Sequence, residues 1–174
     1  MNKISILLPF KENFSPSYAG AVSLFINDTL KLSKYKNNTI VYGNTNFKKI
    51  FKLNYQNINL SKNFFKSQNK RYVEKFINYE KKRNSDLIEL HNRPIYLKYL
   101  VKLLSSKNYI LYFHNDPLTM NGSKSISERT FLLKTCFKII FNSNWSKKKF
   151  LEGMKTDYIN SEKLIVINQS AKKN

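Results

Sequence analysis

The amino-acid sequence predicts an α/β domain with a central parallel sheet of about six or seven strands and helices on both faces. Short apolar runs alternate with helical patterns about five times along the 174 residues. The apolar runs are continuous rather than alternating with polar residues, which is typical of parallel strands that are buried on both faces. No internal repeat or linker interrupts the pattern, so we expect residues 1–174 to form a single domain.

The first third of the chain is predicted to contain two strands and one helix. The apolar run 3–8 is a strand, and Ser17 is a candidate N-cap for a helix over 17–33 whose apolar residues recur at helical spacing. Residues 39–42 form the second strand. The stretch 47–60 is ambiguous and is expected to hold one or two short strands.

The rest of the chain continues the alternation. Pro94 suits the first turn of one helix, and Ser143 is a candidate N-cap for the last helix. We expect strands at 86–90, 109–113, 137–141 and 163–167. We expect helices at 64–83, 93–105, 126–135 and 143–154, with a long loop at 114–125.

The chain is strongly basic, with 31 Lys and Arg against 11 Asp and Glu and a formal net charge of +20. Only four of the basic residues are Arg, the residue that base readout and phosphate clamping favour. Lys, Asn, Ile, Tyr and Phe all have A/T-rich codons, so an A/T-rich genome accounts for much of the excess. Because no RNA-recognition pattern of glycines and aromatics is present either, we do not expect a nucleic-acid partner.

The stretch from Lys48 to Arg83 is the most basic part, with 11 basic and two acidic residues. We interpret it as a surface for the anionic inner leaflet of a membrane, since each basic residue near such a leaflet contributes about 1 kcal/mol. A basic amphipathic helix is typical of membrane surfaces. The alternative, that the apolar stripe of the helix packs on the sheet, stays open. The aromatic residues of this helix include Phe64, Phe65, Tyr72 and Phe76.

Several classes of protein are excluded. Cys136 is the only cysteine, so the chain has no internal disulfide, as expected in a reducing cytoplasm. No apolar run approaches the ~18 residues of a membrane span. The phosphate-binding glycine motifs G-x-G-x-x-G and Walker A are absent, as is the nucleophile elbow G-x-S-x-G. No group of His, Cys, Asp and Glu has metal-ligand spacing, so we expect neither a metal nor a bound cofactor.

Candidate site residues gather directly after the predicted strands, at the sheet edge where parallel sheets bind ligands. His91 and His114 each follow a strand by one residue, although a lone histidine is more often structural. Asn92 and Asn115 come next, and their side-chain amides suit sugar hydroxyls. Asp116 can accept hydrogen bonds from hydroxyls or open an Asp-Pro turn.

Two further candidates lie at predicted helix starts. Gly20, close to the start of the first helix, would let an anionic group approach the helix N-terminus closely. Ser143 follows a predicted strand as well as preceding the last helix.

Essentially the whole chain resembles the N-terminal half of a family 4 retaining glycosyltransferase of GT-B fold. The resemblance is carried by KISILLPF, SYAGAVSLFINDTLKLSK, DLIELHNRPIYLKYL, YILYFHNDPLTM, FKIIFNSNWSKKKFLEG and KLIVINQS, in that order. Its most specific parts are His-Asn-Arg-Pro (91–94), His-Asn-Asp-Pro (114–117) and Asn-Ser-Asn-Trp-Ser (142–146).

The resemblance implies a Rossmann-like acceptor-binding domain that faces a second, donor-binding domain across a cleft. The substrates would be a nucleotide-sugar and a glycan or lipid-linked acceptor, in polysaccharide or lipopolysaccharide synthesis without a metal. His114 would be catalytic and reach the transferring sugar. The residues implied in substrate binding are Gly20, His91, Asn92, Arg93, Asn115, Asp116 and Ser143.

The chain departs from the family after "VINQSAKKN", where the second domain would begin. None of its glutamates form a pair eight residues apart, so the E-x₇-E element of the C-terminal donor-binding domain is absent. We expect this half alone to be inactive, whether it is a domain produced on its own or a truncated gene product. We expect it in the cytoplasm or peripherally on the inner face of the membrane. A non-catalytic basic module that binds anionic membrane or nucleic acid remains the alternative.

Overall fold

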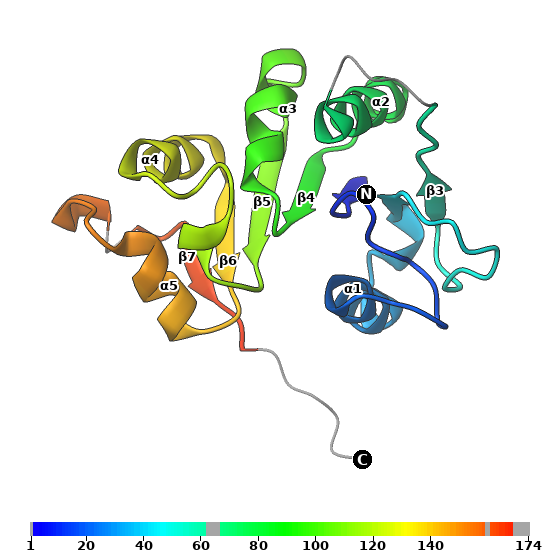
Figure 1. Ribbon diagram of the computed structural model, residues 1–174, viewed down its shortest axis with the longest axis horizontal. Helices are drawn as coiled ribbons and strands as arrows, with labels where there is room; N and C mark the ends of the chain where they lie inside the picture. Colours follow the sequence, from blue (N-terminus) through cyan, green and yellow to red (C-terminus); the bar gives the residue numbers. More distant parts are fainter. Residues whose placement is uncertain (1, 62–66, 159–160, 169–174) are drawn as a thin grey trace.

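A seven-stranded sheet forms the centre of the computed structural model, which describes residues 2–61, 67–158 and 161–168 (Figure 1). The strand order is β3-β2-β1-β4-β5-β6-β7, and all neighbouring strands are parallel. The strands are β1 (Ile4–Leu7), β2 (Thr39–Gly43), β3 (Tyr55–Asn57), β4 (Leu87–His91), β5 (Asn108–Phe113), β6 (Lys138–Phe141) and β7 (Leu164–Val166).

Helices connect most of these strands. The α-helices are α1 (Ala21–Leu32), α2 (Gln68–Arg83), α3 (Leu97–Leu103), α4 (Ile126–Thr135) and α5 (Asn144–Leu151). Short 3-10 helices are η1 (Lys36–Asn38), η2 (Pro94–Tyr96), η3 (Pro117–Thr119) and η4 (Thr156–Tyr158).

The two faces of the sheet pack against different helices because successive strand residues point to opposite faces. Ile6 of β1 packs in a cluster with Val22 and Ile26 of α1. Its neighbour Leu7 belongs to the cluster on the other face, which α2, α3, α4 and α5 cover. In Figure 1, α1 lies below and α2 above the part of the sheet near the N-terminus. The predicted parallel sheet with helices on both faces is confirmed.

Some element boundaries differ from the prediction. Ser17 does not cap α1: it lies in a turn where its backbone N–H donates to Ser15, and the helix starts after Gly20. His91 is the last residue of β4 rather than the residue after it, because β4 stays paired with β5 up to the His91–Tyr112 pair. The stretch 47–60 holds one strand, β3.

The basic helix packs on the sheet. Tyr72 and Phe76 of α2 are fully buried in the core, so they are not available to a membrane. The expectation that α2 offers them alongside its lysines is therefore wrong, and the alternative, that the apolar stripe packs on the sheet, is confirmed. Phe64, Phe65 and Lys66 lie outside the described residues. Within the described part of the chain, no helix is long and apolar enough to cross a membrane.

Candidate functional site

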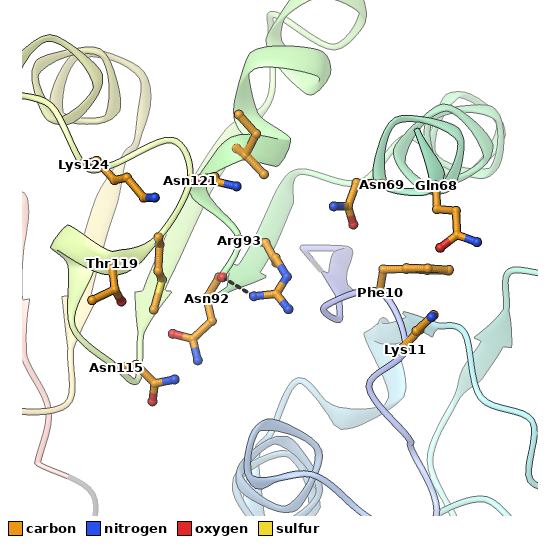
Figure 2. Close-up of a pocket in the computed structure, with 12 residues that line it drawn as sticks. Phe10, Lys11, Gln68, Asn69, Asn92, Arg93, Asn115, Thr119, Asn121 and Lys124 are labelled. Carbon is orange, nitrogen blue, oxygen red and sulfur yellow. Dashed lines mark hydrogen bonds between the residues drawn. The ribbon is translucent and has the colours of Figure 1, made fainter. Parts of the chain in front are cut away.

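A pocket of about 650 Å³ opens beyond the carboxyl ends of β1, β4 and β5 (Figure 2). Such an edge is where open parallel sheets bind ligands, and the volume suits a small-molecule site. In Figure 2, Arg93 projects between Lys11 on one side and Asn115 on the other. The lining residues are Phe10, Lys11, Gln68, Asn69, Asn92, Arg93, Ile95, Asn115, Thr119, Met120, Asn121 and Lys124.

One wall of the pocket is held by Tyr96 of η2. The backbone N–H of Phe10 donates to the Tyr96 hydroxyl at 2.9 Å, and that hydroxyl donates to Asn69 Oδ1 at 3.4 Å. Burial raises the pKa of Tyr96 to about 12, so the hydroxyl keeps its proton at neutral pH. The loop after β1 and the start of α2 are therefore tied to the same buried side chain.

Two pocket residues have a left-handed backbone, with φ of 68° at Lys11 and 51° at Asn92. Non-glycine residues adopt this region rarely, and such residues cluster at functional sites. Asn92 is fixed on both sides, because its N–H donates to the Tyr112 carbonyl at 2.9 Å and its Oδ1 accepts from the His114 N–H at 2.8 Å. The side-chain oxygen of Asn92 thus serves the fold, while the residue still lines the pocket.

The pocket is rich in cations and amides. Lys11, Arg93 and Lys124 line it together with five Asn and Gln side chains, and no carboxylate is among the lining residues. Within the described part of the chain, neither the Lys149–Glu152 ion pair nor the contact between His91 and Glu89 involves any of these cations. The arrangement suits a ligand that is both hydroxylated and anionic.

Beside the pocket, three side chains form a hydrogen-bonded chain. Glu89 Oε1 lies 2.7 Å from His91 Nε2, and His91 Nδ1 lies 2.8 Å from His114 Nε2. Because an ionised carboxylate only accepts, Glu89 selects the His91 tautomer with a proton on Nε2. With both rings neutral, the bare Nδ1 of His91 then accepts from Nε2–H of His114.

Aromatic rings enclose both imidazoles. The Tyr112 ring stacks on His91 with centroids 5.0 Å apart and on His114 at 5.5 Å. Phe25 of α1 meets the His114 ring edge-on at 5.1 Å. His91 is fully buried, so any effect it has on a ligand passes through His114.

Gly20 lies against an internal anion. It is the N-cap of α1, and a Cβ built at Gly20 would lie 2.1 Å from Oε1 of Glu12. That same oxygen accepts from the Ser23 N–H of the first helical turn at 3.1 Å. The close approach that the sequence predicted at Gly20 is thus made here by the carboxylate of Glu12, which interacts favourably with the helix N-terminus.

The remaining predicted residues are distributed unevenly. Asn92, Arg93 and Asn115 come together in the pocket, and His91 meets His114 beside it. Asp116 and Ser143 act as caps, as the sequence predicted for Ser143 and as the Asp-Pro alternative implied for Asp116. Asp116 accepts from the Leu118 N–H at 2.9 Å as the N-cap of η3, and Ser143 accepts from the Ser146 N–H at 3.2 Å as the N-cap of α5.

Sequence reasoning missed several residues of the site. Lys11 lies in the loop that follows β1 and could have been found by its position. Glu89 stands two residues before His91 in β4, and residues two apart in a strand share a face. Asn142, which donates from its side chain to the His114 carbonyl at 2.7 Å, directly follows β6. Gln68, Asn69 and Lys124 had no such signal.

No group of three His, Cys, Asp or Glu side chains that could hold a metal ion exists among the residues that the structure describes.

No protein-family model and no curated protein matches the sequence. Solved structures do match the fold. HepE of Anabaena in complex with UDP superposes with a TM-score of 0.61 at 17% identity, over 95% of this chain and 43% of HepE. MnaA of S. aureus with UDP superposes with a TM-score of 0.59 at 10% identity, over 95% of this chain and 44% of MnaA. The UDP-GlcNAc 2-epimerase of Methanocaldococcus jannaschii superposes with a TM-score of 0.58 at 13% identity, over 94% of this chain and 45% of the epimerase.

The chain therefore spans less than half of the length of each of these proteins and has the fold of one half of a GT-B-like structure. Identities of 10 to 17% establish the fold alone.

Proposed function

We propose that this chain is the acceptor-side half of a nucleotide-sugar-dependent glycosyltransferase that acts on a cell-surface glycan or a lipid-linked acceptor. The observation that carries the proposal is the amide-rich pocket at the ends of β1, β4 and β5, with the His91–His114 pair next to it. The likeness to two proteins crystallised with UDP supports a nucleotide-sugar as the donor.

In this proposal His114 approaches the transferring sugar, while Asn92, Arg93 and Asn115 contact the acceptor. Glu89 and His91 orient the His114 ring through the hydrogen bonds at 2.7 Å and 2.8 Å. Gly20 lies on the donor side, where a phosphate group reaching the N-terminus of α1 would replace the carboxylate of Glu12. Asp116 and Ser143 support the loops after β5 and β6. A second domain would hold most of the donor.

A sugar-transfer assay on the complete gene product tests the proposal. Labelled UDP-sugars are offered with membrane lipid extracts, and incorporation of label into lipid or polymer is measured. We expect transfer that His114→Ala lowers about 100-fold or more, the usual effect of removing a hydrogen-bonding group that acts on the reacting centre. Hydrolysis or transfer that His114→Ala leaves unchanged would contradict the role of His114.

A nucleotide-sugar 2-epimerase is the second candidate, because the likeness to the M. jannaschii enzyme is nearly as close as that to HepE. The same reactions distinguish the two, since an epimerase returns an isomerised UDP-sugar and leaves the acceptor unlabelled. Binding to acidic vesicles or duplex DNA without either product would favour the non-catalytic module.

A further inference from the structure

The four arginines of the chain differ in the partners of their guanidinium groups. Arg71, Arg83 and Arg129 each donate to backbone carbonyls of other segments, those of Ser61, Asn38 and Glu152 respectively. Arg93 differs, because the partners that the structure gives it lie close by along the chain: it donates to the carbonyl of its neighbour Asn92 at 3.0 Å, and its guanidinium also interacts with the hydroxyl of Tyr96. Its guanidinium lines the pocket. The A/T-rich codon bias that accounts for much of the lysine excess does not account for an arginine at position 93.

The backbone of Lys11 is independent evidence that the positive charge of the pocket has a function. Its φ of 68° is a conformation that glycine adopts without strain and that a long side chain adopts at a cost of about 1–2 kcal/mol. Glycine at this position would therefore suit the backbone better. What lysine adds is a positive charge at the edge of the pocket.

The third cation, Lys124, comes from the loop before α4, so the positive charges of the pocket derive from three separate segments. The first turn of α2, with Gln68 and Asn69, adds the positive end of a helix dipole. Three positive charges exceed what one carboxylate neutralises, whereas a phosphate monoester carries about −1.5 to −2 at neutral pH. The amides that share the pocket suit the hydroxyls of an attached sugar.

We propose that this pocket binds a phosphate group through Arg93, with Lys11 and Lys124 adding positive charge on either side of it (Figure 2), so that the acceptor is a phosphate-bearing sugar or lipid-linked sugar rather than a neutral glycan. The assignment to the acceptor rests on the proposed function. A diphosphate of the donor has the same chemistry, and the experiment separates the two sources.

The experiment titrates the 174-residue chain with four probes by isothermal calorimetry and amide chemical shifts. The probes are glucose 1-phosphate, glucose, UDP and inorganic phosphate. We expect glucose 1-phosphate to bind at least ten times more tightly than glucose and than UDP, and to shift the amide signals of Asn92 and Arg93. Raising the salt concentration should weaken the binding of glucose 1-phosphate but not of glucose.

Variants test the named cations. Arg93→Gln and Lys11→Gly should each weaken glucose 1-phosphate at least about fivefold and leave the weak binding of glucose unchanged. Lys11→Gly also suits the backbone at this position, so the variant is expected to fold. Lys82→Met, near the far end of α2, removes the same charge away from the pocket and should leave affinity unchanged. Thermal unfolding checks that each variant is folded.

Each outcome decides the proposal. Equal binding of glucose and glucose 1-phosphate, or binding that neither pocket variant alters, would overturn it. Tighter binding of UDP, weakened by Arg93→Gln, would keep the phosphate site but assign it to the donor and overturn the acceptor assignment. None of these results depends on sugar transfer, so the pocket proposal and the glycosyltransferase proposal can fail separately.

Discussion

His91 and His114 share a hydrogen bond of 2.8 Å that joins the end of β4 to the residue after β5. The buried ring of His91 also contacts Glu89 at 2.7 Å, so a carboxylate is connected to His114 through one imidazole. Glu89 determines which ring nitrogens carry protons in the series Glu89–His91–His114, because an ionised carboxylate can only accept a hydrogen bond whereas each imidazole can donate or accept.

Removing the Glu89 carboxylate should therefore allow His91 to adopt either tautomer. With both rings neutral, we expect the protonated nitrogen of each to be Nε2, which nitrogen-15 long-range NMR spectra of the histidine rings report directly. Glu89→Ala should give a mixture of tautomers at His91, and leaving its buried Nε2–H without an acceptor should lower the unfolding free energy by about 1–3 kcal/mol. Glu12→Ala, which removes a carboxylate elsewhere, is the control. Unchanged histidine spectra in Glu89→Ala would show that Glu89 does not set the tautomer.

Gly20 and Glu12 should be coupled energetically. Gly20→Ala would push the Glu12 carboxylate away from the Ser23 N–H, because the new Cβ would overlap Oε1. We expect a loss of about 1 kcal/mol, the usual value of a helix cap. In a Glu12→Ala background the same change should cost a few tenths of a kcal/mol. Urea unfolding of the four proteins of this double-mutant cycle measures the coupling, and purely additive effects would contradict it.

Gly122 should tolerate no side chain. Its φ is 96°, and a Cβ there would lie 2.5 Å from the backbone nitrogen of Ile95. Gly122→Ala should lower the unfolding free energy by at least about 2 kcal/mol, since strain and a backbone clash add. Gly153→Ala is the matched control: its φ is 74°, but its Cβ would meet only the Ile126 side chain, at 3.3 Å. Similar losses in both variants, measured by urea unfolding, would show that the approach to Ile95 is not limiting.

The fold could be predicted because the continuous apolar strands each carry their own signal. The pocket residues Asn92, Arg93 and Asn115 could be predicted for a related reason, since they come just after strands whose ends must meet at one sheet edge. Gln68 and Lys124 could not be predicted in this way, because they stand at the start of α2 and just before α4, and only the crossover geometry brings those segments to the pocket.

Caps were predictable only where the capping residue is local. Ser143 caps α5 as predicted, and Asp116 opens the Asp-Pro turn that the sequence offered, as the N-cap of η3. Ser17 has the residue type of a cap, yet Gly20 is the N-cap of α1 and Glu12, eight residues upstream of Gly20, supplies the carboxylate. A distant side chain that caps a helix leaves no local pattern.

Glu80 should be important for stability. This fully buried carboxylate accepts from the Ser5 hydroxyl at 2.6 Å and from the Ser85 N–H at 2.6 Å, which joins α2 to β1 and to the turn before β4. Glu80→Ala leaves both donors buried, so we expect a loss of about 3 kcal/mol in urea unfolding. Lys81→Ala, on the exposed face of α2, should change stability by less than about 0.5 kcal/mol. Equal effects of the two variants would contradict the role of Glu80.

The basic face of α2 should bind acidic vesicles mainly by charge. Tyr72 and Phe76 are buried in the core, so Tyr79, which is 37% exposed, is the one aromatic residue of α2 at the surface beside Lys70, Lys81 and Lys82. We expect sedimentation with acidic vesicles at ~0.01 M salt that falls steeply by ~0.15 M, because the Debye length shortens from about 30 to about 8 Å. Reversing the three charges to Glu should weaken it further, at about 1 kcal/mol per residue before screening.

The matched control reverses Lys31, Lys34 and Lys36, which are equally exposed but lie at the end of α1 and in η1. Both triple variants change the net charge by the same amount, so a difference between them reports the position of the surface. Since α1 and α2 cover opposite faces of the sheet, a membrane that meets α2 should be affected little by the α1 variant. Equal weakening by the two variants would show that vesicles respond to total charge and that the stretch from Lys48 to Arg83 forms no specific membrane surface.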